Sequence, residues 1–294
     1  MADAERADGG PVATAVIVNA TASPLGSENL TGTSSGALPA RATRRPRASA
    51  VLLGAIVPIA LLVVWQCVAA SGAVPSYRLP TPLAVWQAAL DLAERGLLFP
   101  DIAISTQRVL LGFVFGSILG LIVGSLIGLS RWASVLAAPT IGALRAVPSL
   151  AWVPLLILYL GIHEDSKVVL ITIGAFFPVY TTVSGALRHV DRHLVEVGRA
   201  YGLGRLSLLA RVQLPAIIPT VVSGLRLALA QSWLFLVAAE LILSTLGLGF
   251  LLKDSQDNGR IDRLFVAIIL LGLLGKVTDT LIGFGERYLL RRWT

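Results

Sequence analysis

The sequence predicts an all-α membrane protein with six transmembrane helices. Of its 294 residues, 55% are hydrophobic and only 14% are charged, with a mean hydropathy of +0.78. A soluble domain carries about 25% charged residues, so the polar surface of this chain is too small to cover a water-soluble globule. Several apolar runs approach the roughly 20 residues that a helix needs to cross about 30 Å of hydrocarbon.

The chain is basic, with a net charge of +7 and a pI near 10.2. This charge could indicate a nucleic-acid partner, but an excess of arginine in the short loops of a membrane protein explains it better. We therefore expect contact with membrane lipid and no nucleic acid. The single cysteine, Cys67, cannot form an internal disulfide.

Residues 1–48 are predicted to be a disordered cytoplasmic tail, because they are rich in Ala, Thr, Ser and Gly and lack hydrophobic periodicity. The tail ends in four arginines (Arg41, Arg44, Arg45 and Arg47). The apolar run that follows exceeds the 7–15 residues of a signal-peptide core, so it predicts an uncleaved anchor. Residues 49–100 then comprise a first transmembrane helix and a connector. Thr81 and Pro82 predict the start of a short amphipathic helix in it.

Six spans are predicted at about 50–70, 107–129, 136–160, 167–187, 216–245 and 263–284. With the N-terminus in the cytoplasm, most arginines of the short loops fall on the cytoplasmic side, as the positive-inside rule requires. Both termini and the segment 190–215 are therefore predicted to be cytoplasmic.

The second span carries a glycine at every fourth position, at Gly112, Gly116, Gly120, Gly124 and Gly128. Because glycine has no side chain, this stripe allows another helix to approach closely. It predicts tight packing, either within the chain or across a dimer interface.

The segment 190–215 is unusually polar for the apolar half of the chain. Asp191 is a plausible N-cap of a short helix, and Gly202 is suited to the left-handed residue that ends it. The apolar residues of this helix are expected to contact the rest of the protein; they are Leu194, Val195, Val197 and Ala200. A second helical stretch runs from there through Arg211 to Pro215.

The order of residues in this segment resembles the EAA loop of the membrane-spanning subunits of ABC importers. The matching positions are Glu196, Gly202, Val212, Leu214 and Pro215. Glu196 and Arg199 are expected to be exposed. The resemblance implies that the loop docks a separate ATPase, with Glu196 facing the ATPase groove or capping the loop, Gly202 forming the turn, and Leu214 and Pro215 joining it to the next span. Val197 and Gly198 stand where the motif has two alanines, which does not undermine the assignment.

The resemblance covers about residues 100–290 and is nearest to the permeases for sulfonates, taurine and nitrate, on segments 144–162, 224–241 and 273–279. It implies a type I ABC importer (MetI-like) transmembrane domain at 101–290 in the cytoplasmic membrane of a prokaryote. It also implies ABC ATPase subunits, which hold the ATP and Mg, an extracytoplasmic solute-binding protein, and a second permease copy. No cofactor is expected on this chain. Neither the solute nor the identity of the second copy is decided by the resemblance.

Four charged residues lie within or near the predicted spans: Arg145, Glu240, Lys276 and Asp279. Such residues usually face protein or water. Lys276 and Asp279 are three residues apart on one helix and are predicted to pair. Arg145 stands close to Pro148 and Ser149, so it could contact an anionic solute in a cavity, or could pair with Glu240. Arg145, Ser149 and Glu240 are the candidate solute-pathway residues.

Catalytic motifs are not convincing. The glycines before Lys276 are too close together for a phosphate loop, and Val277 stands where that loop has Ser or Thr. The histidines His163, His189 and His193 lack the accompanying acidic pattern of a metal site. We therefore predict a permease that is not itself an enzyme. The alternatives are a passive channel, a membrane scaffold or, less favoured, an intramembrane enzyme.

Overall fold

The computed structural model describes the backbone of residues 48–291, together with the side chains of 55–287 apart from positions 149 and 205. Residues 1–47 of the predicted tail lie outside this part. All regular secondary structure of the described backbone is helical, without strands. The elements are α1 (Ala48–Ala70), α2 (Pro82–Glu94), α3 (Leu98–Leu129), α4 (Arg131–Ala146), the 3₁₀ turn η1 (Ser149–Ala151), α5 (Trp152–Leu160), α6 (Glu164–Arg188), α7 (Arg192–Ala200), α8 (Arg205–Leu208), the π-helical η2 (Leu209–Gln213), α9 (Leu214–Leu243), α10 (Leu248–Asp257) and α11 (Ile261–Arg291).

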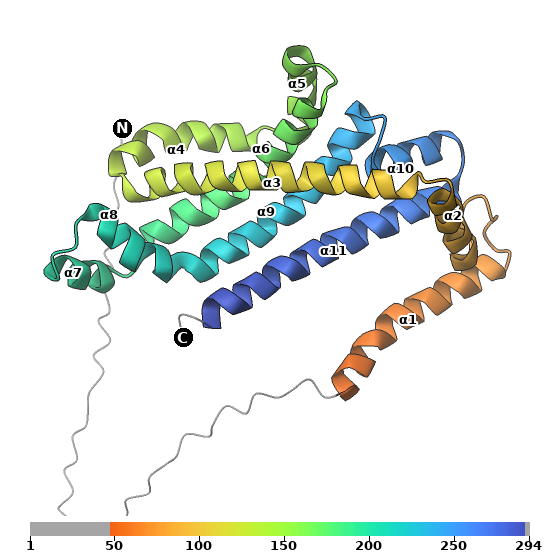
Figure 1. Cartoon of the computed structure of the whole chain (residues 1–294), viewed down its shortest axis with the longest axis horizontal. Helices are drawn as coiled ribbons and strands as arrows, with labels where there is room; N and C mark the ends of the chain where they lie inside the picture. Colours follow the sequence, from red (N-terminus) through yellow and green to blue (C-terminus); the bar gives the residue numbers. More distant parts are fainter. Residues whose placement is uncertain (1–47, 292–294) are drawn as a thin grey trace, which may run out of the picture. The chain divides into compact units, whose positions relative to one another are not determined.

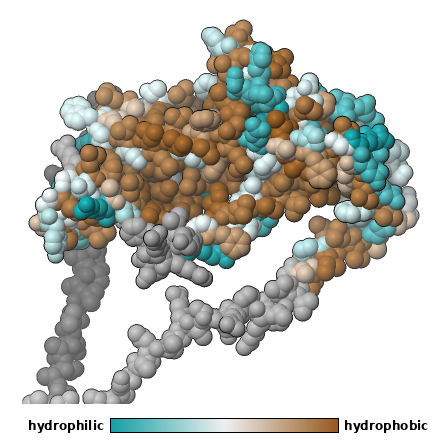
Figure 2. Space-filling view, viewed as in Figure 1, coloured by the Kyte–Doolittle hydropathy of each residue, from teal (hydrophilic) through white to brown (hydrophobic). Residues whose placement is uncertain are grey.

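Four helical stretches in the described part are long and apolar enough to cross a membrane: Leu98–Leu129, Glu164–Arg188, Leu206–Leu243 and Ile261–Arg287. They contain α3, α6, α9 and α11, which run beside one another in Figure 1. On the face shown in Figure 2, apolar residues cover the middle of these helices and polar residues gather toward their ends. The first predicted span corresponds to α1, a helix of 23 residues.

The predicted span at 136–160 is wrong as a continuous helix. It is divided into α4, η1 and α5, with Val147 in an extended conformation at the break. The cause is Pro148: the ring of a proline disfavours the helical conformation of the residue before it. None of the residues of α4 is buried. The six predicted spans thus correspond to α1, the four long helices and one broken pair.

The glycine stripe of α3 lies against α6. A Cβ atom at Gly112 would approach the side chain of Ile171 to 2.5 Å, and one at Gly116 would come equally close to the backbone oxygen of Thr172. At Gly120 and farther along the stripe, the nearest atoms also belong to α6. The glycines therefore set the distance between α3 and α6 along the length of the pair.

The connector between α1 and α3 contains the expected amphipathic helix, α2. The Oγ1 atom of Thr81 accepts a hydrogen bond from the N–H of Ala84 at 3.2 Å, so Thr81 is its N-cap, and proline follows at the first helical position. The inward face packs on α10 and α11 through Val85, Ala88 and Leu92. The next helix, α3, begins at Leu98, nine residues earlier than the predicted span.

Candidate functional site

The short helix α7 begins and ends where its sequence requires. The carboxylate of Asp191 accepts a hydrogen bond from the N–H of His193 at 2.9 Å and caps the first turn. Gly202 has a φ of +75°. The N–H of Leu203 donates to the carbonyl of Gly198, and that of Gly202 to the carbonyl of Arg199. This pattern is the Schellman motif, so Gly202 allows the chain to reverse toward α8.

The residue that brings α7 against the bundle is Gly198. It is the one buried residue of the helix, and a Cβ atom there would lie 2.5 Å from the Cδ1 atom of Leu208. This approach turns the opposite face outward, so Leu194 and Val197 are exposed, together with Tyr201. The expectation that Leu194 and Val197 contact the rest of the protein is wrong, since the contact forms on the side of Gly198 instead.

The exposed surface of α7 therefore combines apolar and charged side chains. Leu194, Val197 and Tyr201 recur at spacings of three and four, which places them on one face. Glu196 and Arg199 are exposed as well. An exposed apolar stripe flanked by charges is the composition expected of a surface that binds another protein.

The chain then passes from α8 through η2 into α9 without a break. The N–H of Leu214 donates to the carbonyl of Leu209, five residues earlier, which is the π-helical pattern. Pro215 follows at the start of α9. Because proline has no N–H and its ring displaces the carbonyl four residues before it, the wider π turn accommodates it. Leu214 and Pro215 thus join α7 and α8 to the spanning helix.

Arg145 lines a cavity of about 350 Å³ between α4, α6 and α9. Gln231 is the other residue with a polar side chain among its described lining residues, and the aromatic walls are Trp152, Phe177 and Phe235. No acidic residue is present among them. The cavity therefore offers one cation and one amide beside an apolar surface. The side chain of Ser149 lies outside the described set.

Glu240 lies elsewhere, so the structure does not bring the three candidate pathway residues together. Its side chain is 0% exposed and pairs with Arg108, whose Nη1 atom is 2.6 Å from a Glu240 oxygen. The predicted alternative of an Arg145–Glu240 pair is therefore wrong. Glu240 also accepts hydrogen bonds from the hydroxyl of Ser105 and the N–H of Gly249.

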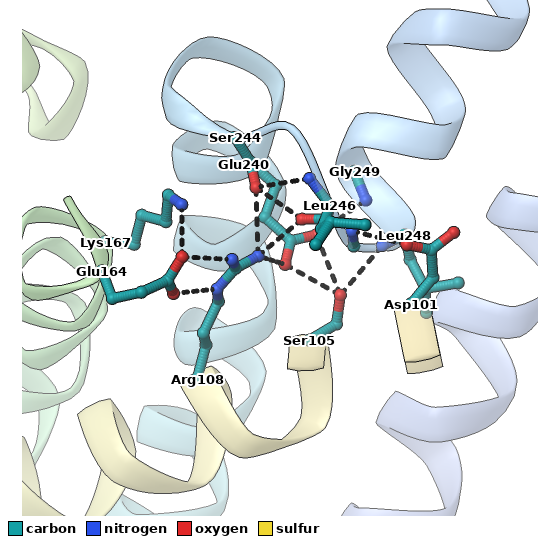
Figure 3. A network of polar contacts seen from close by, with 11 residues as sticks. Asp101, Ser105, Arg108, Glu164, Lys167, Glu240, Ser244, Leu246, Leu248 and Gly249 are labelled. Carbon is teal, nitrogen blue, oxygen red and sulfur yellow. Dashed lines mark hydrogen bonds and ion pairs between the residues drawn. The ribbon is translucent and has the colours of Figure 1, made fainter. Parts of the chain in front are cut away.

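Arg108 is the centre of a larger group that we call the Arg108 cluster: Asp101, Ser105, Arg108, Glu164, Lys167 and Glu240 (Figure 3). The guanidinium of Arg108, which is 3% exposed, donates to both oxygens of Glu164 at 2.7 Å. Lys167 donates to Glu164 at the same distance. The cluster thus joins α3, α6 and α9.

The same cluster holds the turn between α9 and α10. The N–H of Gly247 donates to Asp101, that of Leu248 to Ser105, and that of Gly249 to Glu240. Arg108 donates to the carbonyl of Leu246 at 2.7 Å. These contacts satisfy backbone groups at the start of α10, where the helix itself provides no partners.

A second ion-pair group joins α9 to α11. Arg226 donates to both oxygens of Asp279 at 2.8 and 2.9 Å and approaches Glu286 at 3.5 Å. Lys276 is 4.0 Å from Asp279. The predicted pair of Lys276 and Asp279 is present at the limit of an ion pair, but the main partner of Asp279 is Arg226.

Sequence reasoning missed Arg108, because it stands at the very beginning of the predicted span 107–129. A signal was available: Asp101, Ser105 and Arg108 are spaced by four and three residues, so they share one face of a helix. This polar face continues into a strongly apolar segment, which indicates buried partners.

Comparisons with known proteins give a consistent result. The family model described as "Binding-protein-dependent transport system inner membrane component" matches residues 112–290. A putative aliphatic sulfonates transport permease protein of Escherichia coli is 42% identical over 234 residues, covering 80% of this chain and 89% of that protein. Its namesake in Bacillus subtilis is 36% identical over 238 residues, with coverages of 81% and 86%.

More distant relatives are named for other anions. A bicarbonate transport system permease protein of Synechococcus elongatus and a nitrate import permease protein of Leptolyngbya laminosa are each 30% identical to this chain. They cover 81% and 85% of it, and 90% and 89% of their own lengths. Among solved structures, an inward facing conformation of the MetNI methionine ABC transporter aligns with a TM-score of 0.57 at 22% identity. This alignment covers 67% of this chain and 96% of that one.

Proposed function

The chain belongs to the family of binding-protein-dependent transport system inner membrane components, and from this premise we propose which solute it carries and how it is coupled to ATP. It is a membrane-spanning permease subunit of an ABC importer. ATP hydrolysis takes place on a separate ATPase, and a solute-binding protein is the other partner that the family implies. The alternatives of a scaffold and a passive channel are thereby set aside.

We propose that the solute is a small aliphatic sulfonate and that Arg145 contacts it during passage. The observation that carries this proposal is the composition of the Arg145 cavity. Arg145 and Gln231 are suited to an anionic group, and Trp152 and Phe235 to a short hydrocarbon part. Nitrate and bicarbonate would leave the aromatic walls without a partner. The names of the two relatives at 42% and 36% identity support the same class.

Coupling is proposed to pass through α7. Its exposed residues Leu194, Val197 and Tyr201 would enter a groove of the ATPase, with Glu196 at the rim. Shifting a two-state gate from 1:99 to 99:1 takes about 5.5 kcal/mol, whereas one exposed ion pair contributes at most about 1 kcal/mol. The apolar face must therefore contribute most of the coupling. Glu196→Ala should weaken co-purification of the ATPase only modestly, and Val197→Asp strongly.

The proposed functional unit contains two permease chains. Apolar residues of α4 and α5 remain exposed within the single chain, among them Trp132, Val135, Leu136, Leu158 and Tyr159. A second copy would cover this surface and close the Arg145 cavity from the open side. The end of the bundle that carries α7 is proposed to face the cytoplasm, where ATP is available.

Uptake measurements test the solute proposal directly. In proteoliposomes that contain the complete importer, Arg145→Gln should lower the uptake of radiolabelled ethanesulfonate by about 10- to 100-fold, the loss of one hydrogen bond to a charged group. Arg145→Lys should retain part of the uptake because the charge remains. Lys276→Gln, which also removes a cation from a spanning helix, is the matched control. Undiminished uptake by Arg145→Gln would show that the solute does not contact this cavity.

A further inference from the structure

A second polar cavity, of about 410 Å³, lies at the end of α3 that is remote from the Arg108 cluster. Its described lining residues are Leu129, Ser130, Arg131, Arg199, Leu208 and Gln213. They come from three places: the turn between α3 and α4, the helix α7, and the α8–η2 stretch that leads into α9. The volume lies in the range of ligand-binding cavities, about 300–1,000 Å³.

The two arginines of this cavity have no anionic partner in the described structure. Both Arg131 and Arg199 are exposed, and neither takes part in an ion pair or a side-chain hydrogen bond among the described residues. By contrast, Arg188, at the same end of the bundle, donates to the hydroxyl of Ser134. No acidic residue lines the cavity. Two cations that share one cavity repel each other, so a bound anion would lower the free energy of the pair.

The remaining polar groups of the cavity also suit an oxyanion. The Oγ atom of Ser130 accepts a hydrogen bond from the N–H of Ala133 at 3.2 Å, which leaves its hydroxyl proton available for a ligand. The amide of Gln213 supplies a further donor. Ser130 and Arg131 open the 16-residue helix α4, whose N-terminal end carries positive partial charge.

The surroundings of the cavity indicate the source of the anion. Leu129 contributes an apolar edge, and Trp132, which follows Arg131, is 80% exposed. Tryptophan is enriched at the level of lipid headgroups. Basic pockets between helices on the cytoplasmic side bind anionic headgroups, and the cytoplasmic leaflet is rich in such lipids. A free anion would require none of these apolar neighbours.

We propose that this cavity binds the phosphate group of an anionic phospholipid of the inner leaflet. The bound phosphate bridges Arg131, at the base of α4, to Arg199, on α7. It thereby ties the helix proposed to bind the ATPase to the membrane-embedded bundle. The assignment to the inner leaflet rests on the orientation given under the proposed function.

The test uses the permease–ATPase complex in nanodiscs of phosphatidylcholine with increasing phosphatidylglycerol. Phosphatidylglycerol retained per permease chain is counted by native mass spectrometry. Removal of both cationic groups, in Arg131→Gln with Arg199→Gln, should weaken retention about 25-fold, from about fivefold for each arginine near an anionic leaflet. The matched control is Arg192→Gln with Arg211→Gln. It removes the same charge from exposed positions of α7 and η2 that do not line the cavity.

Three results would overturn the proposal. The first is equal retention by the two double variants. The second is arginine-dependent binding of inorganic phosphate in pure phosphatidylcholine, with no preference for phosphatidylglycerol, which would make this a site for a free anion. The third is loss of the ATPase subunit with unchanged lipid retention, which would assign the arginines to the ATPase interface. Lipid retention is counted whether or not the complex transports. Failure of the lipid proposal is therefore distinguishable from failure of the transport proposal.

Discussion

Replacing Arg108 with methionine should be among the most destabilising changes of a single side chain in this protein. The change removes the only cation that pairs with Glu240 in the described structure, and Glu240 is 0% exposed. Breaking a buried ion pair by removing one partner costs about 3–5 kcal/mol, because the remaining charge is buried without compensation. Ser105 and Gly249 still donate to the carboxylate, but two neutral donors do not replace a guanidinium.

The cluster provides its own controls. Glu164→Gln removes a carboxylate that is 56% exposed, but Lys167, which is 5% exposed, pairs with no other carboxylate among the described residues. Its cost should therefore be about 1.5–3 kcal/mol, as for one hydrogen bond to a charged group. Glu240→Gln leaves Arg108 paired with Glu164, and should cost about 1.5–3 kcal/mol, as for one hydrogen bond to a charged group. The double change Arg108→Met with Glu240→Gln contains no buried charge without a partner. It should therefore be more stable than Arg108→Met alone.

Equilibrium unfolding in mixed micelles titrated with SDS measures these differences. Wild type, Arg108→Met, Glu240→Gln and the double variant form a double-mutant cycle, and Glu164→Gln is measured beside it. Because Arg108 and Glu240 interact, the double variant should lose less stability than the sum of the losses of the two single variants. A loss below about 1 kcal/mol for Arg108→Met, or a double variant less stable than either single one, would refute this reasoning. Water would then reach Glu240 in the native protein.

Three further predictions concern the helix packing, the turn after α7 and acid stability. Gly116→Ala should destabilise the protein by about 1–3 kcal/mol in thermal unfolding, because the added methyl meets a backbone oxygen of α6 at 2.5 Å; Gly185→Ala, with open space around it, should be neutral or slightly stabilising. Gly202→Ala should cost about 1–2 kcal/mol for its positive φ and weaken ATPase co-purification. The hydrogen bond from Arg95 lowers the pKa of Asp91. The stability contributed by the ionised Asp91 is therefore present above the ordinary pKa of an aspartate and is lost as the pH falls through the lowered pKa. Melting temperatures below about pH 4 should depend less on pH in Asp91→Asn.

Local chemistry made several parts of the fold predictable from the sequence. Thr81 and Asp191 are N-caps because their oxygen atoms accept hydrogen bonds from nearby N–H groups, and Gly202 adopts the positive φ that only glycine adopts easily. These features depend on a few neighbouring residues. The break at Val147 also had a local cause, Pro148, but the apolar character of 136–160 suggested a continuous span. Hydropathy reports length and composition and is insensitive to one proline.

Contacts between distant parts of the chain were less accessible. Glu240 could be recognised as a charge in an apolar helix, but its partner Arg108 lies 132 positions away, and a single sequence gives no information on which helices are neighbours. The exposed face of α7 was misassigned for a related reason. Its inward side is set by Gly198, which has no side chain and so gives no hydrophobic signal. A hydrophobic pattern locates a buried face only where side chains, and not backbone, make the contact.

These contacts also determine which part of the chain can move during transport. The Arg108 cluster ties α3, α6 and α9 together at one end, and the glycine stripe holds α3 on α6 along its length, so relative motion among these helices would expose charges or open voids. Helix α4 is different: none of its residues is buried, and it ends at the Pro148 break. Arg145 lies in its last turn, whereas Phe177, Gln231 and Phe235 of the same cavity stand on the fixed helices. The cavity can therefore change shape by displacement of α4 alone, without loss of a buried ion pair.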